Sequence, residues 1–194
     1  MQDTKTTNIL MAGVGGQGVI LASEIVAEAM LRAGYDVKKS EVHGMAQRGG
    51  SVTSHLRFGT KVYSPIIPDG EVDILFSFEL LETLRYVHML GAHPLIIVNN
   101  QKILPPSVIM GKDHYPDNIP DLLSQYCARV HLVSALDIAR SAGNPKALNV
   151  AFVGALSRHI DIPESIWHDA IAAALPPKIV DLNIKAFTLA RQNQ

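Results

Sequence analysis

Gly13-Val14-Gly15-Gly16-Gln17-Gly18 is the stretch of sequence that decides the fold. It follows a short apolar run at residues 8–12 and precedes a helical pattern at residues 19–32, in which polar residues recur every four positions. A G-x-G-x-x-G spacing between a strand and a helix permits a tight turn and lets backbone N–H groups approach an anion. A tight strand-to-helix turn that binds no ligand is the alternative.

The chain beyond Gly34 continues this plan. Residues 35–42 are short enough for a strand, so the opening of the chain predicts strand, turn, helix and strand, a βαβ unit of right-handed sense. Glu41 stands roughly 20 residues beyond the last glycine, where dinucleotide-binding enzymes carry the acid that binds a ribose. A dinucleotide-binding site is therefore one hypothesis at this point.

A β-hairpin is predicted next. Residues 51–58 alternate between apolar and polar side chains, which is typical of a half-exposed strand. Gly59-Thr60 suits a type II′ turn, after which residues 61–67 would pair back with the first arm.

The rest of the chain predicts further α/β layers and then helices. Buried strands are expected at residues 72–78, 94–98 and 129–134, and the pattern is helical from Ala135 onward. We therefore expect one domain over residues 1–194 with a three-layer α/β/α Rossmann-like fold. Its sheet is mostly parallel, with an inserted β-hairpin and a helical C-terminal third.

Composition excludes several functional classes. Seventeen Lys and Arg against 18 Asp and Glu give a formal charge of −1, so no bulk field attracts nucleic acid or an anionic membrane. The single cysteine, Cys127, excludes an internal disulfide and a self-contained iron–sulfur cluster, and we expect a buried, inert thiol. The sequence shows neither a signal-peptide pattern nor an apolar run of membrane-spanning length, so we expect a cytoplasmic protein.

Other catalytic motifs are incomplete. Val19 and Ile20 stand where a P-loop needs Lys and Ser or Thr, which excludes an NTPase. Asp69-Gly70 with Asn99-Asn100 resembles a thiamine diphosphate motif, but Asp69 precedes a strand where the motif's Asp follows one. The eight histidines lack zinc-binding spacing, and Cys127 has no neighbouring base. We predict no metal site and no covalent nucleophile.

The loop at residues 40–51 holds the remaining candidates. Arg48 offers a planar fork for a carboxylate or a phosphate, and Gly49 and Gly50, next to Ser51, allow close backbone approach. The alternatives are a solvated lead-in to the hairpin and internal docking of Arg48 onto Glu41.

Residues 13–18 and 41–51 together resemble the beta-subunit family of indolepyruvate:ferredoxin oxidoreductases, within the wider 2-oxoacid:ferredoxin oxidoreductase gamma-type domain. Residues 63–68 and 78–82 agree with it, and the resemblance runs from about residue 8 into the C-terminal helices. The string His-Gly-Met-Ala-Gln-Arg-Gly-Gly at residues 43–50 is much more specific than the glycine turn.

The resemblance implies an enzyme subunit, inactive alone, that supports conversion of an aryl pyruvate, CoA and oxidised ferredoxin into aryl-acetyl-CoA, CO₂ and reduced ferredoxin. It also implies that thiamine diphosphate, Mg²⁺ and the 4Fe-4S clusters belong to a large alpha subunit, and it assigns no catalytic residue to this chain. We expect the contacts with a cofactor, CoA or that subunit to come from Gly13, Gly15, Gly16, Gln17, Gly18, Arg48, Gly49, Gly50 and Ser51. A free-standing NAD- or flavin-binding oxidoreductase and a ligand-free scaffold remain the alternatives.

Overall fold

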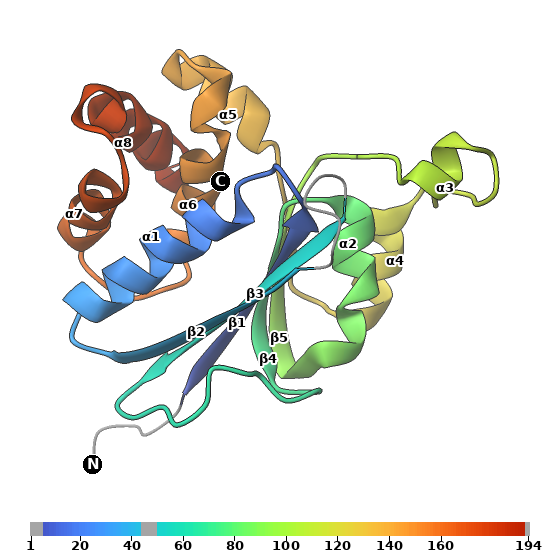
Figure 1. Cartoon of the computed structure of the whole chain (residues 1–194), viewed down its shortest axis with the longest axis horizontal. Coiled ribbons are helices and arrows are strands. Elements are labelled where there is room, and N and C mark those ends of the chain that lie inside the picture. Colours follow the sequence, from blue (N-terminus) through green and yellow to red (C-terminus); the bar gives the residue numbers. More distant parts are fainter. Residues whose placement is uncertain (1–5, 44–49, 193–194) are drawn as a thin grey trace.

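The computed structural model describes residues 6–43 and 50–192, and its centre is a six-stranded sheet of order β2-β3-β1-β4-β5-β6 (Figure 1). Of the strands described, only β3 runs against the others, because it pairs antiparallel with β1 and β2 while the remaining pairs are parallel. The predicted, mostly parallel α/β sheet is confirmed. The strands are β1 (Thr7–Val14), β2 (Asp36–His43), β3 (Ser51–Gly59), β4 (Val72–Ser77), β5 (Leu90–Asn99) and β6 (Val130–Val133).

Helices cover both faces of this sheet, which gives three layers (Figure 1). β1 shows why, since Ile9 and Met11 pack into the core beneath α1, whereas Leu10 and Ala12 pack into the core on the α2 and α4 side. On the first side lie α1 (Val19–Arg32), α5 (Ala135–Ala142), α6 (Leu148–Ser157), α7 (Glu164–Ala174) and α8 (Pro177–Gln192). The second side carries α2 (Leu80–Arg85) and α4 (Ile119–Tyr126), and α3 (Pro106–Ile109) projects beyond the sheet.

The predicted helix at residues 19–32 matches α1 at both ends, and Gly34 follows it with a φ of 89°. Its buried face packs on the sheet and on α7. Ile20 differs from its neighbours, because 39% of its surface stays exposed at the start of the helix.

The predicted second arm of the hairpin is wrong. Residues 61–67 form no strand, because β1 and β2 occupy both edges of β3 and leave no edge for a third partner. Side chains hold this segment instead, since the Val62 N–H donates to Asp36 Oδ2 over 2.9 Å and the Ile67 N–H donates to His55 Nδ1 over 3.2 Å. The inserted hairpin is formed by β2 and β3.

The same pairing changes the predicted βαβ unit. β1 and β2 precede and follow α1 in the chain and run in the same direction, but β3 lies between them in the sheet.

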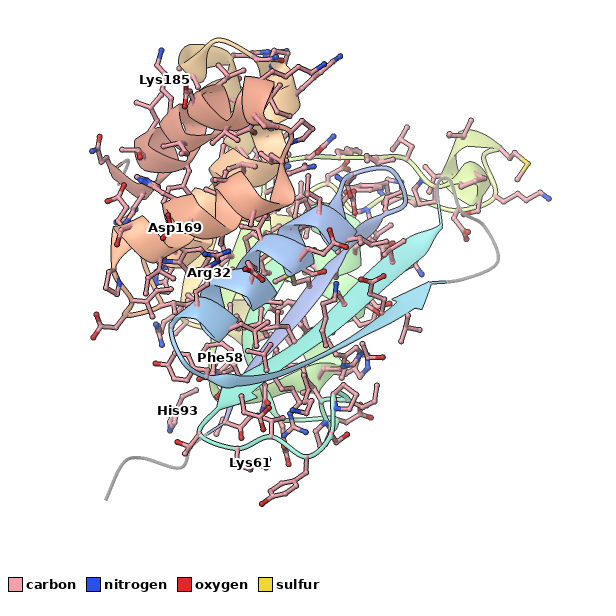
Figure 2. The ribbon with its side chains drawn as sticks, turned by 60° about the vertical axis from the view of Figure 1, so that its left-hand side comes forward. Arg32, Phe58, Lys61, His93, Asp169 and Lys185 are labelled. Atoms are coloured by element: carbon pink, nitrogen blue, oxygen red, sulfur yellow. The ribbon has the colours of Figure 1, made fainter. Side chains whose placement is uncertain are left out.

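Figure 2 shows Lys61 and His93 at the end of the sheet opposite to the one where α3 projects. Among the described residues, no helix is both long and apolar enough to cross a membrane.

The helical C-terminal third is confirmed. α6 is buried along most of its length between its neighbours, and Gly154 sits so close to α8 that an added Cβ would lie 2.3 Å from the Phe187 carbonyl oxygen. These helices pack against one another behind α1, and α6 places Asn149 next to Gly18 of the glycine turn.

Candidate functional site

The carboxyl ends of β1 and β4 lie side by side and send the chain in opposite directions. After β1 the chain enters α1 on one face of the sheet, and after β4 it enters α2 on the other. In open α/β sheets, this switch point is where a crevice forms and ligands bind. Two cavities open here, and Val14 lines both of them.

The glycine turn shapes the first cavity through its backbone. Gly16 and Gly18 have φ angles of 102° and 79°, and Gly18 is the N-cap of α1. Added Cβ atoms would meet different surroundings, because at Gly18 one would lie 1.9 Å from Asn149 Nδ2, whereas Gly16 has no atom within 4 Å. Gly18 is thus favoured by its left-handed backbone and by the space that Asn149 occupies beside it, whereas Gly16 faces open space.

This first cavity, which we call the glycine-loop cavity, has a volume of about 420 Å³. Its lining is mostly apolar, and no charged side chain contributes to it among the residues described. Two donors of the turn are already used, since the Gly15 N–H donates to the Gly50 carbonyl over 2.8 Å and the Gln17 N–H to the Val14 carbonyl over 3.0 Å. The residues that line it are Val14, Gly15, Gly16, Gly18, Val19, Ile20 and Val52.

The Gln17 side chain forms hydrogen bonds with the segments at the carboxyl ends of three strands, β1, β4 and β5. Its Oε1 accepts from the Val14 N–H over 2.7 Å, and its Nε2 donates to the Phe78 carbonyl over 2.9 Å and to Gln101 Oε1 over 3.0 Å. The amide therefore acts within the protein, where it fixes the glycine turn against the segments that follow β4 and β5.

The second cavity, which we call the Ser51 cavity, has a volume of about 430 Å³ and lies between β3, α2 and the segment that leads into α3. Ser51 donates to Glu82 Oε2 over 2.6 Å, so Tyr86 is the donor in its 3.0 Å contact with the Ser51 hydroxyl. Arg85 Nε lies 3.1 Å from Glu82 Oε1. The cavity thus has a polar floor that sequence spacing alone does not show.

Burial dominates the electrostatics of this floor. Glu82 is 5% exposed, and burial raises the pKa of its carboxyl group. The Glu79 charge adds to this shift, whereas the Ser51 hydrogen bond and the Arg85 charge oppose it. A carboxylate here is a strong hydrogen-bond acceptor in a poorly solvated place.

A second buried carboxylate, Glu79, connects α2 to the segment before α3 and to Tyr115 through hydrogen bonds. It caps α2 by accepting from the Glu82 N–H over 2.8 Å. Its other oxygen accepts from the Ile103 N–H over 3.0 Å and from the Tyr115 hydroxyl over 2.6 Å. Burial and this bond to Glu79 raise the pKa of Tyr115, which keeps the phenol a donor.

The structure brings most of the predicted site residues together at the switch point, namely Gly13, Gly15, Gly16, Gln17, Gly18, Gly50 and Ser51. Arg48 and Gly49 lie outside the described residues. Sequence reasoning missed Glu79, Glu82 and Tyr86. For the two acidic residues a signal was available, because Glu79 and Glu82 lie three apart directly after an apolar strand, a spacing that favours a helix N-terminus.

Glu41 does not reach the glycine turn as the dinucleotide alternative requires. β3 separates its strand from β1, so two inter-strand spacings, roughly 10 Å, lie between them. Its carboxylate pairs with Lys39 Nζ over 2.8 Å. Within the described part of the chain, no group of three or more His, Cys, Asp or Glu side chains could hold a metal ion.

Two proteins of known name are similar to this chain along most of its length. The proteins called indolepyruvate oxidoreductase subunit IorB from Archaeoglobus fulgidus and Thermococcus kodakarensis are 45% and 40% identical to the chain. These alignments cover 94% and 95% of this chain, and 92% and 94% of the respective relatives.

Solved structures show the same fold at lower identity. The pyruvate oxidoreductase subunit PORC from Thermotoga maritima aligns with a TM-score of 0.71 at 23% identity and covers 97% of both chains. A 2-oxoglutarate:ferredoxin oxidoreductase from Magnetococcus marinus, solved with 2-oxoglutarate, coenzyme A and succinyl-CoA bound, aligns with a TM-score of 0.71 at 20% identity. That match covers 99% of this chain and 32% of the larger one.

A family model described as pyruvate ferredoxin/flavodoxin oxidoreductase matches residues 8–193, which is nearly the whole chain. This match and the identity with two archaeal relatives over nine-tenths of their length agree with the resemblance of residues 13–18 and 41–51. The chain therefore belongs to the pyruvate ferredoxin/flavodoxin oxidoreductase family.

Proposed function

We propose that this chain is the small subunit of an indolepyruvate:ferredoxin oxidoreductase. The observation that carries the proposal is the 45% identity to a protein named indolepyruvate oxidoreductase subunit IorB, over 92% of that protein's length. In the reaction, one aryl pyruvate and one CoA thiol give aryl-acetyl-CoA, CO₂ and a proton, and two electrons pass to ferredoxin.

The chemistry of the chain supports a division of labour with a large subunit. The sequence holds one cysteine, and its thiol is buried, with the Sγ 3.2 and 3.4 Å from the carbonyl oxygens of Pro94 and Arg129. An iron–sulfur cluster normally needs four thiolates. We therefore assign the clusters to the large alpha subunit, and we assign thiamine diphosphate and Mg²⁺ to it because the family resemblance implies this. This chain then supplies a surface for contact.

That surface is the crevice at the switch point. The glycine-loop cavity and the Ser51 cavity open at one end of the sheet, and Gly50 links them by accepting a hydrogen bond from Gly15. We assign the contact with CoA or with the large subunit to the predicted set, in which Gly13 and Gln17 hold the glycine turn in shape from within and the contacts come from Gly15, Gly16, Gly18, Arg48, Gly49, Gly50 and Ser51. Arg48 is the anchor for a carboxylate or phosphate in this assignment.

The proposal is tested by producing this chain with and without a candidate large subunit. The chain alone should be colourless and should not reduce ferredoxin, whereas the complex should reduce it when indolepyruvate and CoA are both present. Pyruvate and 2-oxoglutarate serve as controls for the substrate. A complex that prefers either control, or a chain that is brown and active alone, would contradict the proposal.

A further inference from the structure

The outer edge of β2 has no strand partner. β2 is the last strand on its side of the sheet, so within the described residues it pairs with β3 alone (Figure 1). Every second residue of an antiparallel edge strand directs its N–H and C=O away from the sheet, where another strand can bind them. β2 offers such an edge over eight residues.

The side chains of this edge carry charges of both signs. Lys38 and Lys39 are of the residue type that usually protects an edge, because lysines repel their own copies. Glu41 offsets this repulsion, since its Oε1 accepts from Lys39 Nζ over 2.8 Å.

The charges of Lys39 and Glu41 are already held in place. Lys39 Nζ also lies 3.3 Å from Ser23 Oγ of α1, and the Lys39 and Glu41 side chains are only 25% and 26% exposed. Among the described residues, these contacts use two of the three ammonium donors of Lys39 and leave acceptor positions on Glu41. Each group can therefore take one more partner of the opposite charge at little cost in side-chain entropy.

Two-fold symmetry limits how two copies of this edge can pair. An axis perpendicular to the sheet makes the two β2 strands antiparallel and keeps α1 of both copies on the same face. Opposite residues then point to the same face, and side chains alternate between faces along a strand. Each possible register is therefore centred on one residue, which lies opposite itself.

The register centred on Ser40 brings unlike charges together. Lys39 then lies opposite Glu41 of the second copy, and Glu41 lies opposite its Lys39, with Cβ atoms ~4.5–5.5 Å apart. Lys38 lies opposite Val42, which is 53% exposed and can be covered by the methylene chain of the lysine. Registers centred on Lys39 or on Glu41 would instead place two ammonium groups or two carboxylates opposite each other.

We propose that two copies of this chain associate by antiparallel pairing of β2 with β2, centred on Ser40, so that their sheets become continuous. The inference goes beyond the proposed function, because it concerns two small subunits and not the contact of one with a large subunit. The assembled enzyme then contains its small subunits in pairs.

Ser40→Cys tests the register directly. Opposite Cα atoms lie ~4.5–5.5 Å apart, which suits a disulfide. Mild oxidation of the full-length variant, alone and with the large subunit, should link most of it into covalent dimers on a non-reducing gel. Lys38→Cys is the matched control and should stay unlinked, because its two copies would lie four positions, ~13 Å, apart along the strands. The native Cys127 is buried and common to both variants.

Exchange of the charges tests the complementarity. Glu41→Lys places like charges opposite each other at two symmetry-related positions, so it should weaken dimerisation of the full-length chain about 10-fold or more in sedimentation velocity. Addition of Lys39→Glu restores unlike pairs with the signs exchanged and should bring the dissociation constant back to within about 3-fold of wild type. Asp137→Lys breaks the exposed pair with Arg140 on α5 by the same change of charge, and it should have no effect.

Several results would overturn the inference. One is a wild-type chain that stays monomeric while folded Ser40→Cys links no more than Lys38→Cys. Another is a double variant that remains as weak as Glu41→Lys. A disulfide that forms in the chain alone but not in the complex would overturn it in favour of the large subunit at this edge. A paired enzyme that does not act on aryl pyruvates would instead contradict the proposed function alone.

Discussion

The two cavities beside Val14 have similar volumes, about 420 and 430 Å³, but they are built in different ways. The glycine-loop cavity is shaped by the glycine turn, the start of α1 and Val52 of β3, and its described lining carries no charge. The Ser51 cavity collects side chains from β3, α2 and the segment before α3 around a buried carboxylate. The first cavity thus presents mainly backbone and apolar groups, whereas the second also presents the Glu82–Arg85 ion pair.

The largest loss of stability should come from adding a side chain at Gly18, where the glycine turn has no free space. Gly18→Val places a β-branched side chain at a φ of 79° and against Asn149, so strain and overpacking together should lower the free energy of unfolding by ~2–5 kcal/mol. Urea denaturation of the isolated chain measures it. A variant with wild-type stability and full activity in the complex would show that the close contact is not required.

The Arg48 side chain should matter for assembly rather than for folding. Arg48→Ala should weaken the complex or raise the apparent KM for CoA, with ~2–5 kcal/mol lost if the arginine forms a desolvated pair. Arg48→Lys should restore part of this, since a point charge does not replace a bidentate fork. A lower melting temperature of the isolated chain, with the complex fully active, would assign Arg48 to the fold.

Gly16 provides the matched comparison with Gly18. Gly16→Ala meets no atom, so only its φ of 102° is unfavourable and the loss of stability should be ~1–2 kcal/mol. If CoA or the large subunit fills the glycine-loop cavity, the affinity measured by titration should fall by more than the stability does. An unchanged affinity would mean that this cavity is not part of the contact surface.

The smallest expected effect is a pH dependence of the folding stability, which Glu82 of the Ser51 cavity should contribute and the glycine-loop cavity should not. Burial raises the pKa of the Glu82 carboxyl group in the folded chain above the 4.5 of a free glutamate, so the folded chain takes up this proton more readily than the unfolded chain. The stability of wild type relative to Glu82→Gln should therefore be highest below pH 4.5 and should fall as pH rises through the folded pKa. Urea denaturation from pH 4 to 8 checks the sign, and a difference that grows with pH would contradict it.

Local patterns were sufficient to predict much of the fold and the glycine turn. The helix at residues 19–32 matches because its polar period, glycine start and Gly34 stop are all contained in one segment. The second hairpin arm at residues 61–67 failed because its formation depended on an edge of β3 that distant strands already occupy. Strand order in the sheet is set by non-local pairing, which local alternation does not reveal.

The same reasoning explains what was found and missed in the site. Gly13 to Gly18 form one contiguous motif, whereas Ser51, Glu82 and Pro105 come together only after the chain has folded. The role of Glu79 as a helix cap could be predicted weakly from the spacing of Glu79 and Glu82 in the sequence. Its hydrogen bonds with Ile103 and Tyr115 could not be predicted, because they join residues far apart in the chain. Arg48 and Gly49 lie outside the described residues, and their roles stay predictions.

Hydrogen–deuterium exchange of the chain, alone and in complex with its large subunit, tests most directly whether the crevice is the working face. We predict that assembly slows exchange at residues 13–20, 50–52 and 101–110, which border the two cavities. Peptides at the opposite end of the sheet, such as residues 59–71, should exchange unchanged and act as the internal control. Slower exchange at residues 59–71, with the crevice unaffected, would contradict the account.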